Sequence, residues 1–479
     1  MCASLVLVAT RDGLRLSPDS ITYLSVADHL RHGRGLTDFT GDQLTVFGPV
    51  QPLLLAPGGR GIGWARVVSA VCVGAAAWLQ YVLIRARAGF VAGVIGAVLL
   101  GACASFVLVA ASGFSELPYI AASLAMFVVF RHGVSPGRCA LAGALASIGF
   151  LARYAGASLV MAGAMVVALA VLRPERGGDR WRSVAAYTVG AGVPATAWIV
   201  HNLAVDGHPL GPRFEGGTSD SWGVLLRRPF RALGDVLIGE GHSADWATAI
   251  GVLALIALVV AGLVWEGNGT LDPVRAGLLV YAAANFALPV VARRLTANDI
   301  SARVMSPMLI PLVYVVAVAA GAVIRSWPGR LLVASAVGLW AWQGVTMAAD
   351  VPDYASSGDR SLYSAEMYDA VDALPADVQL LTNNPWGLWW QSRREPTLFA
   401  FTRPRPGNSH YPIGAERLLS LACERPTYLA WFSSLTNAGD GPEERRPDLL
   451  RVVRLDAEHE VAGGVLYRVQ PHDEASCTG

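Results

Sequence analysis

Apolar residues occupy most of this chain, in long runs that short polar segments separate. A helix rises about 1.5 Å per residue, so a helix that crosses roughly 30 Å of hydrocarbon needs about 20 apolar residues. Runs of about this length predict an α-helical polytopic membrane protein with about 10–11 spans. The ten clear runs are Ile62–Ile84, Phe90–Ala111, Leu117–Phe130, Cys139–Ala152, Ala155–Leu172, Val184–Leu203, Trp246–Trp265, Val274–Val291, Val304–Ile324 and Leu331–Ala348.

The first apolar run, from Cys2 to Thr10, is too short to cross a bilayer as a helix. Two explanations stay open. Either a span is truncated here, as a misassigned start codon would cause, or these residues only enter the membrane interface. We count the run as a partial eleventh span.

A polar segment, residues 11–60, follows this run and carries the signals of a short helix. Ser17 suits the N-cap, Pro18 the first helical position and Asp19 the first turn, where the helix dipole favours a carboxylate. Helical spacing continues to about Leu30, which predicts an amphipathic helix along the bilayer surface. Prolines within residues 47–52 then turn the chain back toward the membrane.

The hydrophobic period changes after residue 349, so we expect two domains, 1–349 in the membrane and 350–479 outside it. The second domain combines helix-like and strand-like segments, which predicts a small C-terminal extracytoplasmic α/β domain of roughly 130 residues. The helix-like segments are Ser361–Leu374 and Trp386–Arg394, and the strand-like segments are Val378–Thr382, Thr427–Phe432 and Gly464–Val469.

Arginines gather in every second loop, and short cytoplasmic loops collect positive charge. These arginines lie within residues 85–87, 131–138, 173–182, 275 and 325–330. The remaining loops are therefore predicted to be extracytoplasmic, together with the C-terminal domain. They are residues 11–60, 112–116, 201–245 and 292–303. We expect a multi-pass protein of the plasma membrane.

Composition agrees with a membrane protein and excludes some partners. The chain is 53% hydrophobic and 15% charged, with a mean hydropathy of +0.44, so membrane lipid is its expected surrounding. A net charge of +1 gives no basis for expecting a nucleic acid partner. Of six cysteines, only Cys423 and Cys477 lie in the polar tail, where they can pair if the tail faces an oxidising compartment.

The predicted outer loops carry both acids and cations. This combination suits a reaction in which a carboxylate takes a proton from a hydroxyl while arginines stabilise a departing phosphate. A sugar linked to a lipid phosphate is a natural substrate for such a site at a bilayer edge. The candidate acids are Asp19, Asp42 and Glu116, and the candidate phosphate ligands are Arg153, Arg213, Arg303 and His201.

Each candidate also has a structural interpretation. Asp19 could be a helix cap, Glu116 a solvated helix end, and Asp42 a second acid, an acceptor contact or a plain loop residue. An unpaired guanidinium at the end of a span is costly, so Arg153 either binds phosphate or forms a salt bridge with Glu116. His201 could carry a proton or a phosphate hydrogen bond, or cap a helix.

The sequence contains no cluster with metal-ligand spacing, neither an HExxH motif nor a CxxC pair. A divalent cation held by Asp19 or Asp42 is compatible with the sequence, because carboxylate sites for Mg²⁺ or Mn²⁺ leave little trace in it. We therefore assign no metal ligand and no certain cofactor.

Seven short motifs follow one another along essentially the whole chain. They are Pro18-Asp19-Ser20, Phe47-Gly-Pro-Val-Gln-Pro52, Ser115-Glu-Leu-Pro118, Arg153-Tyr-Ala-Gly156, Trp198-Ile-Val-His-Asn202, Gly211-Pro-Arg213 and Arg303-Val-Met-Ser-Pro307. Their order resembles the GT-C superfamily of integral-membrane glycosyltransferases. This superfamily includes the protein mannosyltransferases, the aminoarabinose transferases of lipid A and the actinobacterial arabinosyl- and mannosyltransferases.

The resemblance implies inverting transfer from a polyprenyl-phosphate-linked sugar to a hydroxyl of a glycan, lipid or protein acceptor, on the extracytoplasmic face. It also implies an acidic general base in the first outer loop, a role that maps onto Asp19. Two positions depart from the family pattern. Ser20 stands where many members have a second acid, and His201-Asn202 stands where Arg-Asn is usual.

Two other interpretations compete with transfer. A non-catalytic transporter or flippase of a lipid-linked glycan would place ionisable residues and broken helices near the midplane, often in two related halves. The predicted spans are nearly free of such residues, and no related halves are evident. An inactive GT-C-like assembly subunit would keep the fold without the chemistry.

Overall fold

The computed structural model describes residues 1–172, 179–211, 218, 220–239, 242–265, 272–296, 299–353, 364–399, 413–433, 441–472 and 477. Contacts between residues divide the chain into two compact units, which we describe separately. The first unit comprises Met1–Leu14 and Thr45–Asp353, and the second comprises Arg15–Leu44 and Tyr354–Gly479.

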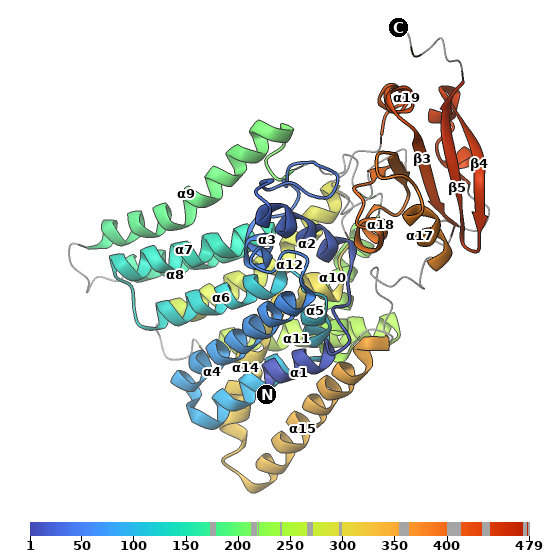
Figure 1. Ribbon diagram of the computed structural model, residues 1–479. Coiled ribbons are helices and arrows are strands. Elements are labelled where there is room, and N and C mark those ends of the chain that lie inside the picture. The colour runs from blue at the N-terminus through green and yellow to red at the C-terminus, as the bar shows by residue number, and fades with distance from the viewer. Residues whose placement is uncertain are drawn as a thin grey trace. The chain divides into compact units, whose positions relative to one another are not determined.

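The first unit is helical throughout its described elements (Figure 1). Its longer elements are α1 (Cys2–Ala9), α4 (Ile62–Gly101), α5 (Ala104–Ala111), α6 (Glu116–Arg131), α7 (Pro136–Ala152), α8 (Ala157–Leu172), α9 (Arg180–Asp206), α10 (Trp222–Ile238), α11 (Ala244–Trp265), α12 (Pro273–Thr296), α14 (Leu309–Val323) and α15 (Trp327–Asp350). Short elements connect them: α3 (Val50–Leu55), η1 (Tyr154–Gly156), α13 (Ala302–Met305), η3 (Ser306–Met308) and η4 (Val351–Asp353).

Within the described part, seven helices are long and apolar enough to cross a membrane. All ten predicted apolar runs lie on helices, but α4 contains one run and part of the next. Gly89 (φ 86°) has a non-helical backbone and divides α4 into two segments. Helices α6, with 16 residues, and α7, with 17, are shorter than the roughly 20 residues that a span needs.

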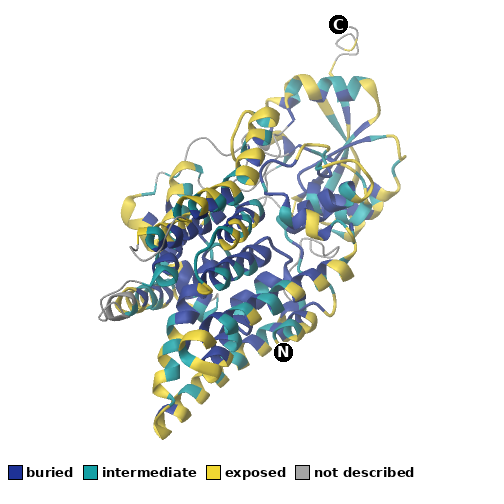
Figure 2. Ribbon diagram, turned by 90° about the vertical axis from the view of Figure 1, so that its left-hand side faces the viewer, coloured by how far each residue is buried: buried dark blue, intermediate teal, exposed yellow. Residues whose placement is uncertain are grey.

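Packing inside this unit relies on apolar side chains and on glycines between helices. Buried residues gather in the interior and exposed ones on the outward faces (Figure 2). Large outward side chains such as Trp78, Leu253 and Trp342 are more than half exposed, as expected for helices that face lipid. Helices α7 and α9 approach closely, because a Cβ on Gly143 would lie 2.5 Å from the Tyr187 carbonyl oxygen.

The second unit contains a five-stranded mixed sheet in the order β2-β1-β3-β5-β4. Strand β1 pairs in parallel with β2 and β3, whereas β5 pairs antiparallel with β3 and β4. The strands are β1 (Gln379–Thr382), β2 (Thr397–Leu398), β3 (Thr427–Phe432), β4 (Val453–Val461) and β5 (Gly464–Pro471). The helices are α2 (Pro18–Arg31), α17 (Ala365–Asp372), α18 (Pro385–Ser392), α19 (Ala415–Glu424) and α20 (Pro442–Arg445), with η6 (Leu449–Arg451).

Adjacent residues of β1 face opposite sides of this sheet, so each side has its own core. Leu380 packs with residues of α17 and α18, and Leu381 packs with residues of α19. Strands β1 and β3 are therefore apolar on both faces, which explains why sequence reasoning found them. The predicted fold class, helical membrane spans with a small C-terminal α/β domain, is confirmed.

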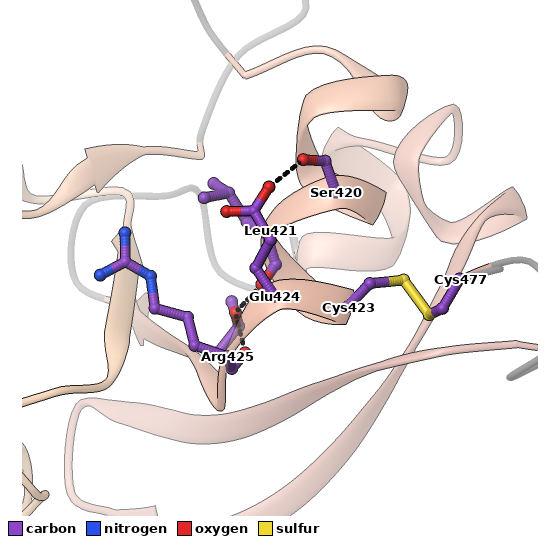
Figure 3. Close-up of a disulfide and its surroundings, with 7 residues drawn as sticks. Ser420, Leu421, Cys423, Glu424, Arg425 and Cys477 are labelled. Atoms are coloured by element: carbon purple, nitrogen blue, oxygen red, sulfur yellow. Dashed lines mark hydrogen bonds between the residues drawn. A yellow bond between two sulfur atoms is a disulfide. The ribbon is translucent and has the colours of Figure 1, made fainter. Parts of the chain in front are cut away.

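A disulfide joins Cys423, in the last turn of α19, to Cys477 (Figure 3). The two Cα atoms lie 5.5 Å apart, within the normal range for a disulfide. The pairing that the sequence allowed is therefore present. The bond crosslinks the chain terminus to the sheet-covering helix across 54 residues of sequence.

Candidate functional site

An ion-pair cluster in the first unit joins three of the predicted site residues. Glu116 is the first residue of α6, Arg153 directly follows α7, and Arg303 lies in α13. Oε1 of Glu116 accepts a hydrogen bond from Nε of Arg303 (2.5 Å) and another from the Arg153 guanidinium. The salt bridge between Arg153 and Glu116 that the sequence offered as an alternative is therefore present.

The three side chains of this cluster differ in how far they are exposed. Glu116 is fully buried, whereas the side chains of Arg153 and Arg303 are 18% and 25% exposed. The Arg303 guanidinium also lies 3.6 Å from the ring centroid of Phe114, a cation–π contact. One buried carboxylate thus holds two partly exposed guanidiniums side by side, and guanidiniums are suited to binding anions such as phosphate.

The second oxygen of Glu116, Oε2, is buried and makes no hydrogen bond within the described part of the chain. A solvated helix end, the interpretation that the sequence offered for Glu116, is therefore wrong, because the whole side chain is withdrawn from water. The helix start still suits the acid, because a carboxylate in the first turn interacts favourably with the helix dipole.

A second cluster is centred on Tyr154, the residue after Arg153. Its hydroxyl accepts hydrogen bonds from Trp198 Nε1 (3.0 Å) and Asn202 Nδ2 (2.9 Å), and it donates to the Thr45 carbonyl oxygen (2.5 Å). Sequence reasoning gave Tyr154 no role, although it lies inside one of the motifs. It fixes the backbone beside Arg153 to helix α9 and to the segment that starts at Thr45.

His201 stacks on Trp198, with ring centroids 4.9 Å apart and planes 27° from parallel. Its Nε2 atom is buried and has no hydrogen-bond partner among the described residues, and the same is true of Asn202 Oδ1. Stacking on Trp198 thus holds the His201 ring in place. The phosphate role predicted for His201 stays a prediction.

Glycines allow the motif segments to touch. A Cβ on Gly48 would collide with the Leu151 carbonyl oxygen, and one on Gly211 would lie 2.6 Å from the carbonyl carbon of Thr45. Gly211 also has φ +74°, which disfavours other residues. Gln51 Nε2 donates to the Gly113 carbonyl oxygen (2.8 Å). Residues of two motifs therefore contact Leu151, Thr45 and Gly113, each of which lies two residues before another motif.

Asp19 lies in the first turn of α2, in the second unit. Ser17 caps this helix by accepting from Ser20 N (3.2 Å), and the Ser20 hydroxyl accepts from Ser17 N in return. The predicted cap is confirmed, and the Asp19 side chain is half-buried. The predicted helix is also confirmed, but its predicted amphipathic character is wrong, because burial runs continuously from Ser20 to Ala27 and so includes every face of α2.

Asp42 is exposed, in a loop of the second unit. Its Oδ2 atom accepts from the Thr40 hydroxyl (2.9 Å), which also donates to Asp38 Oδ1 (2.6 Å). These two hydrogen bonds are local, and the role of Asp42 stays a prediction. Arg213, the remaining predicted phosphate ligand, lies outside the described residues.

In the part of the chain that the structure describes, no three His, Cys, Asp or Glu side chains gather in a way that could hold a metal ion. The cation that the sequence left open at Asp19 or Asp42 stays a prediction.

Neither a protein-family model nor a curated protein sequence matches this chain. Solved structures do match it. ArnT from Cupriavidus metallidurans, bound to undecaprenyl phosphate, superimposes with a TM-score of 0.64 at 12% sequence identity, over 98% of this chain and 96% of its own. AglB, an oligosaccharyltransferase from Archaeoglobus fulgidus in complex with an inhibitory peptide and a dolichol-phosphate, gives 0.56 at 12% identity, over 97% and 73%.

The arabinofuranosyltransferase AftD from Mycobacteria gives a TM-score of 0.56 at 15% identity, over 98% of this chain but 40% of its own. These three neighbours are GT-C glycosyltransferases. The chain therefore has the GT-C glycosyltransferase fold, and the resemblance seen in the motifs is confirmed at the level of fold.

Proposed function

We propose that this protein is a glycosyltransferase that moves a sugar from a polyprenyl-phosphate donor to a hydroxyl acceptor on the extracytoplasmic face, with inversion. The observation that carries the proposal is the pair of arginines, Arg153 and Arg303, bound by one buried carboxylate. Two structural neighbours contain a lipid phosphate, undecaprenyl phosphate in ArnT and dolichol-phosphate in AglB.

The proposed roles follow from the chemistry of each group. Arg153 and Arg303 donate hydrogen bonds to the donor phosphate, and His201 and Arg213 add further donors. Glu116 does not act as a second acid in this scheme, since one oxygen bonds both guanidiniums. It positions them instead, and it lowers their combined charge from +2 to +1.

The reaction balances without a further reagent. Asp19 takes the proton from the acceptor hydroxyl as its oxygen attacks the anomeric carbon of the sugar. The bond between that carbon and the phosphate oxygen breaks, and the polyprenyl phosphate leaves as an anion that the arginines stabilise. Attack opposite the leaving group inverts the anomeric centre. Asp42 remains a proposed acceptor contact.

The proposed orientation rests on the disulfide. Disulfides persist in oxidising compartments and are rare in the cytosol. A bond between Cys423 and Cys477 therefore supports an extracytoplasmic C-terminal unit. Asp19 belongs to the same compact unit as this disulfide, so the same argument favours an extracytoplasmic Asp19.

The test is sugar transfer by the purified full-length protein with a panel of polyprenyl-phosphate sugars and hydroxyl acceptors. Asp19→Asn is expected to lower kcat by roughly 10²- to 10⁴-fold and to leave donor binding unchanged, because the base acts only on the acceptor. Arg303→Lys is expected to weaken donor binding by roughly tenfold, because lysine keeps the charge but not the two-pronged geometry.

Asp12→Asn is the matched control, because Asp12 is an exposed acid whose side chain pairs with the neighbouring Arg11. It should keep the wild-type rate. Full activity of Asp19→Asn would remove the base assignment. Binding of lipid-linked sugar without transfer by the wild-type protein would favour a transporter or an inactive subunit.

A further inference from the structure

Helix α2, which carries Asp19, is connected to helix α18 by a chain of hydrogen bonds within the second unit. Trp386, in the first turn of α18, donates from Nε1 to the Thr22 hydroxyl oxygen (3.2 Å). The Thr22 hydroxyl donates in turn to the Pro18 carbonyl oxygen (3.0 Å). That carbonyl belongs to the peptide that links Pro18 to Asp19. The hydrogen bonds therefore run from an indole of the C-terminal segment to the backbone of the proposed base.

Aromatic packing fixes the indole that begins this chain. Phe39 is fully buried, with its ring centroid 6.5 Å from that of Trp386 and 5.8 Å from that of Trp389. The first contact is edge-to-face, with planes 75° apart, a favourable arrangement for aromatic pairs. Phe39 and Thr22 both come from the segment Arg15–Leu44, so this segment contacts Trp386 from two sides.

The other end of α2 is fixed by Glu395, three residues after α18 ends. Its carboxylate lies 2.5 Å from the Arg34 guanidinium and 3.5 Å from His29 Nε2. Arg34 also lies 3.6 Å from Asp28. Burial and, next, the charge of Arg34 lower the pKa of His29 from its ordinary value of 6.5, so the ionic partner of Glu395 at neutral pH is Arg34.

We propose that Trp386 is a positioning residue for Asp19, acting through Thr22 and the Pro18 carbonyl. This inference rests on the proposed function, in which Asp19 is the general base. Trp386 has no titratable group, and its one N–H donor is bonded to Thr22, so it takes no part in proton transfer. The indole limits the movement of the first turn of α2, which carries the Asp19 carboxylate. Correct placement of a catalytic group contributes strongly to enzymatic rates.

The test compares Trp386→Phe, Thr22→Val and Thr22→Ser in the full-length protein. Trp386→Phe keeps a smaller aromatic ring beside Phe39 and removes the N–H donor. Thr22→Val keeps the shape and removes the hydroxyl, whereas Thr22→Ser retains it and should rescue the wild-type rate. Trp390→Phe is the control for a tryptophan on the same helix, and it should leave the rate unchanged.

We expect Trp386→Phe and Thr22→Val each to lower kcat by roughly tenfold with an unchanged KM for the donor, since a displaced base affects the chemical step. The double variant should be no slower than the worse single variant, because both break one chain of hydrogen bonds. Hydrogen–deuterium exchange of the peptide 17–24 should become about five- to tenfold faster in both single variants, the change expected on losing one net hydrogen bond.

Two results would overturn the positioning role. One is unchanged exchange at residues 17–24 in Trp386→Phe, and the other is faster exchange with a wild-type kcat, which would mark a purely structural contact. A failure of the proposed function looks different. Full activity of Asp19→Asn would remove the base, and with it the catalytic purpose of Trp386, while the exchange data would still decide whether the indole holds this turn.

Discussion

At the scale of single residues, the interpretation of Glu116, Arg153 and Arg303 depends on one carboxylate. A buried carboxylate is expensive unless it is paired, and here one of its oxygens bonds two guanidiniums. The sequence identified all three residues as candidates, because acids and arginines stood at predicted helix ends. It offered the pair of Arg153 and Glu116 as one alternative, but it did not pair Glu116 with Arg303, because proximity between residues 187 positions apart leaves no local pattern.

Tyr154 provides a prediction at this scale. Tyr154→Phe removes the acceptor for Trp198 and Asn202, and it leaves the buried Trp198 N–H without the partner seen here. We expect the free energy of unfolding to fall by roughly 1–3 kcal/mol, the cost of a buried unsatisfied group. Thermal unfolding in detergent measures this change, with Tyr81→Phe as the control, because Tyr81 bonds only the exposed Arg85 in the described part of the chain. An unchanged melting temperature in Tyr154→Phe would contradict the role of this hydroxyl.

At the scale of elements, hydrophobic periodicity located the helices well and their ends less well. Strand β3 was predicted with its observed bounds, because an apolar strand that is buried on both faces has a clear signature. Strands β2 and β4 were missed. Strand β2 has two residues, too few to show a pattern. Strand β4 is an edge strand that alternates apolar and charged residues from Val453 to Glu458, so its signal was present in the sequence and was not used.

Gly48 provides a prediction for the segment that joins the motifs. In Gly48→Ala the new Cβ would collide with the Leu151 carbonyl, two residues before Arg153. We expect a loss of roughly 1–3 kcal/mol in the free energy of unfolding, typical of overpacking, together with weaker donor binding. Gly63→Ala is the control, because a Cβ there meets nothing within 4 Å and alanine favours the helix. If Gly48→Ala had the wild-type free energy of unfolding, the backbone segments at Gly48 and Leu151 could separate without loss of stability, and the prediction would be wrong.

At the scale of the whole molecule, the GT-C fold could be predicted from the order of weak motifs along a membrane-type sequence. The assignment of Arg15–Leu44 to the C-terminal unit could not. This segment precedes the spans, and its contacts with α18 lie more than 300 residues away along the chain. Sequence separation of this size gives no periodic signal, so only the structure reveals it.

The disulfide allows a prediction about the second unit as a whole. Cys423→Ser is expected to lower the free energy of unfolding of this unit by roughly 2–4 kcal/mol, because the crosslink restricts the unfolded chain. Thermal unfolding with and without a reductant measures the loss, and Cys72→Ser is the control, since Cys72 is a free thiol. Alkylation with a maleimide-coupled polymer should leave Cys423 and Cys477 of the unreduced protein unmodified. Labelling of both in protein taken from cells would place the tail in a reducing compartment.

The membership of Arg15–Leu44 in the second unit also has a consequence for how the protein is made. The ribosome synthesises this segment before its packing partners in α18, and 364 positions separate Thr22 from Trp386. At about 5–20 residues per second, roughly 20–70 seconds pass between the synthesis of Thr22 and that of Trp386. Thr22 and Phe39, which contact Trp386, lack this partner throughout that interval. Helix α2 can therefore pack against α18 only after most of the chain has been synthesised.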